Sequence, residues 1–318
     1  MHSKTKIIIP TICIIVLLVV GFNISKITTS LANFLDPTPK IVIEKGNAYT
    51  KKEGFLLVKN SETYIPYSQK DLMDIIYGTL NNGWVTFTFY CPKEYTNCFN
   101  DLKEITNDSI YLTHINNYVH PYNSIKGMDI LKSETGEVTL KPKYVYTLDE
   151  RDDIDKETNL VIKQIITDDM ETYDKIRTIH DYIINNVRYD VQRNDTGTSP
   201  YQSNSAFGPL FQGYATCDGY ADLLAIYLNK LGIKNYRIAK IDNSDDPGHV
   251  WNAVFLNNQW LHIDLTWDDP VASNGEDILR HTYFLITNEE LALADQGKEE
   301  ITSHHFDPNI YLEFKAKN

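Results

Sequence analysis

The clearest hydrophobic pattern of the chain is helical and lies in its C-terminal half. Apolar side chains recur there at intervals of three and four, at Tyr220, Leu223, Leu224, Tyr227, Leu228 and Leu231. This spacing predicts a largely buried helix, with Thr216 as its N-cap and Gly232 as its stop. Helical segments are also expected at about 155–168 and 171–187, the second with one apolar face. The polar stretch 192–205 predicts a loop.

Residues 41–148 combine helical and alternating patterns and predict a small α+β domain. The expected elements are helices at 72–77 and 111–118 and strands at 84–90 and 137–146. We find no chemical motif in this region and interpret it as a binding or spacer module of unknown role. The acidic stretch 149–153 marks its end and suits a helix start. A second domain is therefore expected over 149–318.

Two β-rich runs, 247–256 and 259–267, are separated by a pair of asparagines. Asparagine tolerates positive φ, so a two-residue hairpin turn is expected between the runs. In that register His249 and Asp264 become diagonal neighbours on one face, because side chains alternate along a strand. A three-residue loop would place them on opposite faces. The hairpin therefore brings an imidazole within reach of a carboxylate.

Cys217 falls in the first turn of the predicted C-terminal helix. Backbone N–H groups and the positive end of the helix dipole stabilise a thiolate there, and the same N–H groups can form part of an oxyanion hole. Each residue also has a plainer interpretation. A lone cysteine at a buried helix start more often packs, and a histidine or aspartate in a hairpin is more often a surface group. His262 shares the face of Asp264 and is an alternative base, although we interpret it as a structural neighbour.

Three separated motifs carry a family resemblance: residues 216–221 (TCDGYA), 248–252 (GHVWN) and 262–270 (HIDLTWDDP). Over roughly residues 170–290 the chain resembles the transglutaminase-like superfamily, the bacterial branch of papain-like thiol folds. The segment 179–190 (IHDYIINNVRYD) is similar to the one that precedes the core in that family. The order and spacing of the motifs outweigh the plainer interpretation of each residue.

The resemblance implies an α+β fold with a papain-like core, in which the cysteine helix packs on an antiparallel sheet. It implies that Cys217 is the nucleophile, His249 the base and Asp264 the orienting carboxylate. Gln212 is the candidate for the upstream residue that completes the oxyanion hole. The departure we note is valine rather than alanine after His249, which leaves all three residues in place.

The implied activity is acyl transfer from peptide or protein amides through a thioester on the cysteine. Water as the acceptor makes the protein a peptidase or amidase, and a lysine amine makes it a cross-linking transglutaminase. The alternative is a catalytically inactive module of the same fold that binds cell-wall or surface peptides or glycans. The intact set of three residues favours the enzyme.

The N-terminus predicts a membrane segment. Lys4 and Lys6 precede an uncharged run at 7–22, which is typical of a signal anchor, and the proline-containing residues 23–40 are expected to form a linker. Because the lysines stay inside, the main domains are expected outside the cell membrane. Cleavage near residues 30–32 is the alternative, which would give a secreted protein. Cell-wall or surface peptides are then the expected substrates.

Composition bears on the class of partner, on disulfide formation and on the possible metal sites. The formal charge of −13 disfavours nucleic acid, and 42% hydrophobic residues indicate a globular protein. Outside the membrane, a disulfide between Cys91 and Cys98 is one expectation and two separate thiols the other. No cofactor is predicted. The turn at 268–270 and the pair His304-His305 lack the ligand spacing of a metal site.

Overall fold

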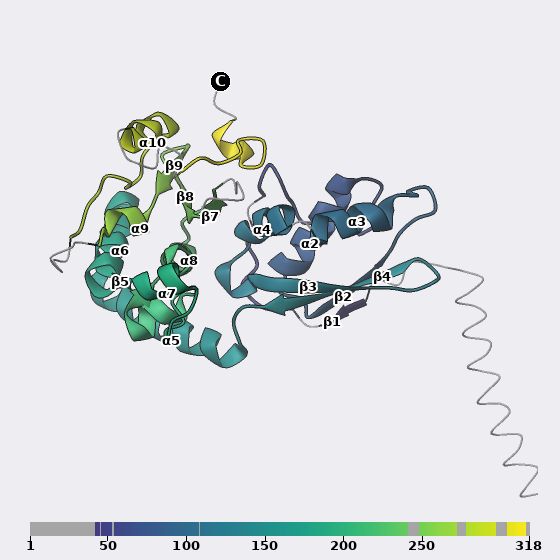
Figure 1. Cartoon of the computed structure of the whole chain (residues 1–318), viewed down its shortest axis with the longest axis horizontal. Helices are drawn as coiled ribbons and strands as arrows, with labels where there is room; N and C mark the ends of the chain where they lie inside the picture. The colour runs from purple at the N-terminus through teal and green to yellow at the C-terminus, as the bar shows by residue number, and fades with distance from the viewer. Residues whose placement is uncertain are drawn as a thin grey trace, which may run out of the picture. The chain divides into compact units, whose positions relative to one another are not determined.

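The C-terminal half is organised around helix α8 (Cys217–Lys230), which packs on an antiparallel sheet of order β7-β8-β9 (Figure 1). These strands are Asn235–Ala239, Val250–Leu256 and Gln259–Ile263. The side chain of Asn252 donates to the carbonyl of Ala221 at 3.0 Å and so ties β8 to the helix. The computed structural model describes residues 42–44, 46–52, 54–107, 109–240, 248–271, 278–296 and 304–315.

The hairpin of β8 and β9 has the predicted turn and register. Leu256 pairs with Gln259, and both asparagines between them have positive φ, 51° and 62°. The predicted strand 259–267 is wrong in its second half, because β9 ends at Ile263 and helix α9 (Leu265–Asp268) follows. The Asp264 side chain accepts a hydrogen bond from the backbone of Trp267 and caps that helix, which ends the strand.

Helix α8 begins and ends at the predicted residues, but its start is held differently. Thr216 occupies the N-cap position, yet its hydroxyl donates to the carbonyl of Ser203 at 3.3 Å and not to the helix. Gly232 follows the helix with φ +69°, and the N–H of Ile233 donates to the carbonyl of Leu228. At the other end, Cys217 directly follows the N-cap Thr216 and is the first residue of the helix.

Several helices precede α8 in the chain. They are α5 (Leu148–Ile165), α6 (Thr172–Asn186) and α7 (Val191–Thr196), followed by the π-helical turn Gly208–Gln212. Residues of α5 and α6 share the apolar core of α8. Strands β5 (Arg188–Tyr189) and β6 (Tyr214–Ala215) form a short parallel pair, and α10 (Asn288–Asp295) comes after the sheet.

The polar sequence before α8 therefore contains more helix than we predicted. The loop expected at 192–205 begins inside α7, because Asp190 caps that helix by accepting from the backbone of Arg193. Helix α5 starts before the expected residue 155, where Thr147 and Glu150 form a capping box. Local capping contacts explain both differences.

The N-terminal region is a mixed sheet-and-helix layer, as predicted. Its antiparallel sheet has the order β1-β2-β4-β3, with strands Val42–Glu44, Thr86–Tyr90, Glu137–Tyr144 and Ile125–Lys132. Helices α2, α3 and α4 lie over one face of this sheet (Figure 1). They span Gln69–Asn81, Cys98–Asn107 and Ser109–Asn117, and a 3₁₀ turn, Pro121–Asn123, follows them. The sequence patterns missed α3, β1 and β3. The whole described chain is α+β.

Buried contacts connect the N-terminal region to the back of the C-terminal sheet. One apolar core contains residues of α2 and β2 together with Tyr236, Ile238 and Trp251 of β7 and β8. The ammonium group of Lys51 donates to the carbonyl of Asn235 at 2.6 Å. The division of the chain into domains 41–148 and 149–318 stays a prediction, since this core includes residues from both.

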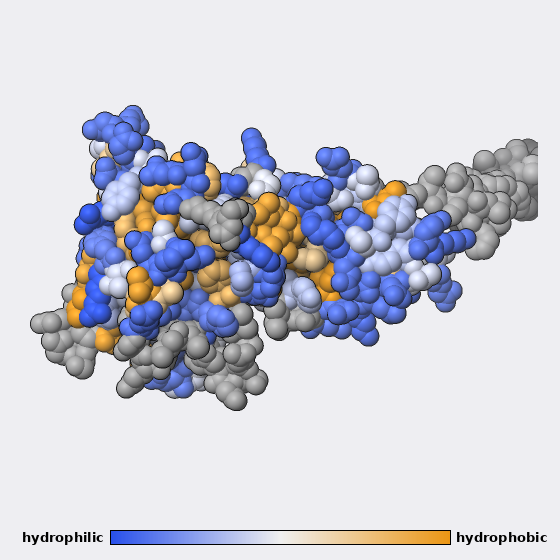
Figure 2. Space-filling model, turned by 90° about the horizontal axis from the view of Figure 1, so that it is seen from above, coloured by the Kyte–Doolittle hydropathy of each residue, from blue (hydrophilic) through white to orange (hydrophobic). Residues whose placement is uncertain are grey.

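None of the described helices is long and apolar enough to cross a membrane. The expected anchor at 1–22 and linker at 23–40 lie outside the described residues. On the face drawn in Figure 2, hydrophilic residues cover much of the described surface and apolar patches lie between them. The membrane prediction therefore depends on the sequence alone.

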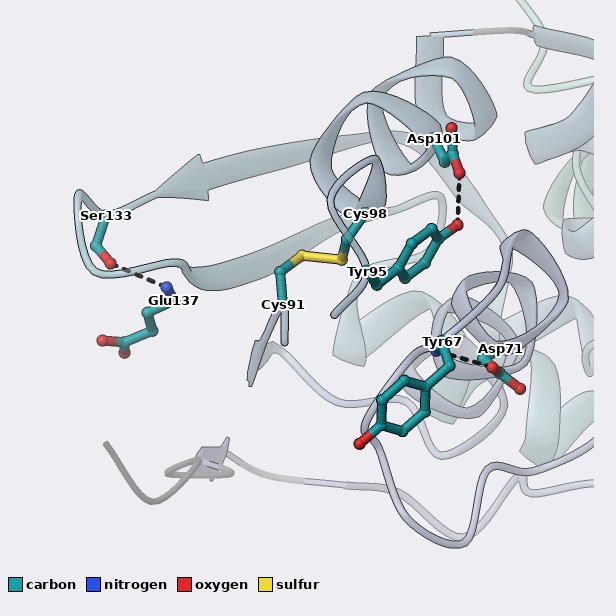
Figure 3. The surroundings of a disulfide bond; sticks show 8 residues. All are labelled: Tyr67, Asp71, Cys91, Tyr95, Cys98, Asp101, Ser133 and Glu137. Atoms are coloured by element: carbon teal, nitrogen blue, oxygen red, sulfur yellow. Dashed lines mark hydrogen bonds between the residues drawn. A yellow bond between two sulfur atoms is a disulfide. The ribbon is translucent and has the colours of Figure 1, made fainter. Parts of the chain in front are cut away.

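A disulfide joins Cys91, after β2, to Cys98 at the start of α3 (Figure 3). Tyr95 lies inside the closed loop and donates a hydrogen bond to Asp101 at 2.5 Å. Both cysteines pack against the N-terminal apolar core, where Cys98 is buried. The crosslink thus fixes the connection from the sheet to helix α3.

Removal of this disulfide should lower the free energy of unfolding by roughly 2.5 kcal/mol, the chain-entropy value for so short a loop. Urea denaturation of the Cys91→Ser/Cys98→Ser variant beside the wild type measures the difference. Peptide mapping without reductant should show the two cysteine peptides as one crosslinked species. Two separate peptides under those conditions would contradict the crosslink.

Candidate active site

Cys217 and His249 line one open cavity of about 690 Å³. The walls come from the start of α8, from α7 and the strand before it, and from α9 with the residues beside it. The described lining residues are Tyr189, Arg193, Asn194, Asn204, Thr216, Cys217, Asp218, Lys240, Gly248, His249, Thr266, Trp267, Asp269, Pro270, Val271 and Arg280. Cys217 is partly exposed at the start of its helix, so the thiol is accessible from the cavity.

His249 and Asp264 form a hydrogen-bonded pair at one end of the hairpin. His249 directly precedes β8 and Asp264 directly follows β9, and the two strands pair from Asn252 and Ile263 outward to the turn. The Nε2 atom of His249 lies 2.5 Å from Oδ2 of Asp264. The carboxylate is buried, whereas the imidazole keeps a small exposed fraction toward the cavity. The geometry is that of a carboxylate orienting an imidazole.

The charges of the site favour a protonated His249. Burial lowers the pKa of His249, but the Asp264 carboxylate and a hydrogen bond with Cys217 outweigh burial and raise this pKa to about 9. Burial also acts to raise the pKa of Asp264, and the attraction of His249 holds it well below its usual range. At neutral pH the site therefore contains an imidazolium beside the cysteine sulfur and an ionised carboxylate behind it.

This pKa predicts a charge-dependent alkylation of Cys217. Below pH 9 the imidazolium should favour anionic iodoacetate over neutral iodoacetamide, and above it the preference should fall. The expected decrease is about fivefold, the factor for ~1 kcal/mol of attraction between unit charges ~4 Å apart in water. Mass spectrometry of the Cys217 peptide gives both rates over about two pH units on either side of the His249 pKa of about 9.

The matched control for this measurement is the His249→Ala variant. Arg193 and Arg280 also line the cavity, but guanidinium groups remain charged throughout the range and cannot produce the step. The variant should show a flat ratio near pH 9. A step of equal size in the variant would assign the charge change to another group.

Two sequence candidates lie apart from this pair. His262 is buried, accepts from the indole of Trp251 through Nδ1 and donates to Asn288 at 2.6 Å through Nε2. Burial lowers its pKa to about 3, so it is neutral and serves as a structural neighbour. The side-chain oxygen of Gln212 accepts from the backbone of Gln202 at 2.7 Å, and Gln212 is not among the described lining residues.

Sequence reasoning missed Tyr189 and His304. Tyr189 lines the cavity beside Cys217, and burial together with the charge of the cysteine raises its pKa to about 12, so its hydroxyl is a neutral donor. Its position in the segment RYD before the core was a usable signal. The imidazole of His304 lies 2.9 Å from the carboxylate of Asp264, although the two residues are 40 positions apart in the chain. No local sequence pattern indicates this contact.

Two groups of side chains bring histidine and aspartate atoms within 4.8 Å of one another. They are His180 with Asp181 and His281, and His249 with Asp264 and His304. In each group the imidazoles already bond to the shared carboxylate, at 2.8 and 2.6 Å in the first and 2.5 and 2.9 Å in the second. We interpret both as hydrogen-bond networks.

The fold and this site define a thiol-bearing α+β domain, with the cysteine at a helix start and an imidazole–carboxylate pair beside it. Residues 160–265 match the family model described as transglutaminase-like superfamily. That segment of the chain belongs to the transglutaminase-like superfamily. The match includes Cys217, His249 and Asp264 and ends before α10.

Curated relatives are distant and much longer. The chain is 22% identical to mouse kyphoscoliosis peptidase over 153 residues and 25% identical to the human protein over 139 residues. These alignments cover 43% and 38% of this chain but only 22% and 20% of the relatives. A crystal structure of a TGase is similar to 45% of the chain and 44% of its own, at 15% identity and a TM-score of 0.33.

Proposed function

We propose that the protein is a thiol-dependent enzyme that transfers acyl groups from peptide or protein amides, with Cys217 as nucleophile, His249 as acid and base, and Asp264 as the orienting carboxylate. One observation carries this proposal. The imidazole bonded to buried Asp264 lines the same open cavity as Cys217, the only free cysteine of the described chain, and Cys217 is near enough to help raise the pKa of His249. An imidazole beside a cysteine can give and take the protons that acyl transfer on the sulfur requires.

The first half-reaction forms a thioester. The Cys217 thiolate attacks the amide carbonyl carbon, and the C–N bond breaks as the His249 imidazolium gives its proton to the leaving nitrogen. The oxyanion of the intermediate requires donors near the sulfur. Backbone N–H groups at the start of α8 are one source, and the hydroxyl of Tyr189 is a better-placed side-chain candidate than Gln212.

The second half-reaction releases the acyl group. Neutral His249 removes a proton from water or from an amine, which attacks the thioester carbon and frees the thiolate. Water gives a carboxylic acid, and an amine gives a new amide. Asp264 stabilises the imidazolium that forms in each half.

Trapping of the acyl-enzyme tests this proposal. The full chain is incubated with dimethylcasein, with and without hydroxylamine, and a parallel sample contains biotinylated cadaverine. Hydroxamate on casein is expected with hydroxylamine, new amino termini or free ammonia indicate hydrolysis, and biotin incorporation indicates cross-linking. If casein binds the chain but none of these products forms, the protein is a binding module of this fold.

We also propose that the enzyme acts outside the cell membrane, on cell-wall or surface peptides. The uncharged run at 7–22 after Lys4 and Lys6 supports an N-terminal anchor, and the Cys91–Cys98 disulfide suits an oxidising compartment. Protease treatment of intact cells tests the topology. Digestion of residues beyond 40 is expected, and their protection would contradict an outward-facing domain.

A further inference from the structure

His304 lies at the centre of a buried chain of charged groups behind the active site. Its Nε2 atom is 2.9 Å from Oδ2 of Asp264, and its Nδ1 atom is 2.9 Å from Oδ1 of Asp295. The imidazole is fully buried, and both carboxylates are nearly so. The carboxylate that orients His249 therefore accepts from a second imidazole at the same oxygen atom.

We propose that His304, held between two carboxylates, is a positioning residue that fixes Asp264 and partly neutralises its charge toward His249. This inference rests on the thiol-enzyme function proposed above. His304 does not line the described cavity and so acts through Asp264.

The donor and acceptor inventory requires His304 to be charged. A carboxylate is an acceptor only, so an imidazole that bonds one through each nitrogen must carry a proton on both. Burial lowers the pKa of His304, but its bonds to Asp264 and Asp295 outweigh burial and raise it. The order His249, Asp264, His304, Asp295 then alternates positive and negative charges with a net charge of zero.

Aromatic side chains hold the ring in place and keep water from it. The ring centroid of His304 lies 4.7 Å from that of Tyr283, 5.0 Å from Trp251 and 5.4 Å from Trp267. The other titratable groups that face it are His249, at 5.3 Å between centroids, and neutral His262, whose pKa is lowered by burial and by the charge of His304. The Tyr283 hydroxyl donates to Asp295 at 3.0 Å and fixes the far carboxylate.

This support comes from the end of the chain. Asp295 is the last residue of α10, and His304 belongs to the described C-terminal segment 304–315. Both follow the segment 160–265 that matches the superfamily model. The C-terminal residues of this chain thus set the position and effective charge of a carboxylate inside the matched segment.

The His304→Gln variant removes the positive charge but keeps a side-chain donor for Asp264. The Asp264 carboxylate then acts on His249 alone, so the imidazolium of His249 should persist to higher pH. The iodoacetate preference of Cys217 should fall about 1 pH unit later than in the wild type. Casein turnover should decrease about tenfold in kcat, with KM nearly unchanged, because Asp264 is less firmly oriented.

Two controls separate positioning from folding. Exposed His305 is the matched control, and His305→Gln should leave the pH midpoint and turnover unchanged. If the single variant fails to fold because buried Asp295 has lost its charge partner, the double variant His304→Gln/Asp295→Asn removes one charge of each sign and should fold. The double variant should show the same shift in the pH midpoint of the iodoacetate preference. A folded variant with a wild-type midpoint would overturn the proposal.

A measurement on the wild type requires no variant. The ¹⁵N resonances of the histidine rings at pH 7 should show His304 protonated at both nitrogens. A neutral His304 at that pH would overturn the proposal. If the wild type instead shows no charge-dependent alkylation and His249→Ala behaves like it, the proposed enzyme function fails first, whatever the state of His304.

Discussion

Replacement of Cys217 by alanine should lower casein turnover by about 10⁴-fold or more, the usual loss when the nucleophile of a covalent mechanism is removed. No other described sulfur can replace it, since Cys91 and Cys98 are joined to each other. Hydroxamate formation with hydroxylamine should disappear as well, because no thioester can form. Amino termini, ammonia and incorporated biotin measure the three outcomes on the same samples.

The Cys217→Ala protein should fold like the wild type, because the side chain is partly exposed and its loss leaves no large cavity. Circular dichroism and the thermal midpoint serve as the control. Cys217→Ser tests the sulfur itself, since a hydroxyl is a much weaker nucleophile at neutral pH. Turnover near the wild-type rate in a folded alanine variant would leave the structure without a nucleophile and refute the mechanism.

Arg237→Met should be among the most destabilising single substitutions, with a loss of about 3–5 kcal/mol. Arg237 of β7 forms a buried ion pair with Asp222 of α8, with side-chain exposures of 8% and 5%. Its guanidinium also donates to the carbonyl of Asn116 and the hydroxyl of Ser124, each at 2.8 Å. Asp222 accepts a further hydrogen bond from Tyr146. Without the arginine, a buried carboxylate loses its charge partner.

The chain offers a matched control for this ion pair. Lys143 and Asp129 pair on β4 and β3 with exposures of 54% and 55%, so Lys143→Met should change the free energy of unfolding by less than about 1 kcal/mol. The double variant Arg237→Met/Asp222→Leu should recover part of the loss, because the unpaired charge is then absent. Urea denaturation measures all four proteins. Equal effects at the two sites would show that burial does not decide the energy of these pairs.

Local sequence patterns determined the elements that bear the three candidate residues. The apolar repeat after Thr216 predicted helix α8 with Cys217 in its first turn, and the two asparagines predicted the turn and register of the hairpin. These features depend on contacts between residues close in sequence, such as a cap, a stop and a two-residue turn. Composition and spacing report such contacts directly.

Only the tertiary structure decided what surrounds those residues. Asp264 leaves the strand to cap α9, yet it still bonds His249 because the hairpin register brings the two strand ends together. His304 reaches the same carboxylate from beyond the matched segment, and Tyr189 reaches the cavity from a two-residue strand. Such contacts join residues far apart in the chain, so their free energy depends on packing and burial, which a local pattern does not contain.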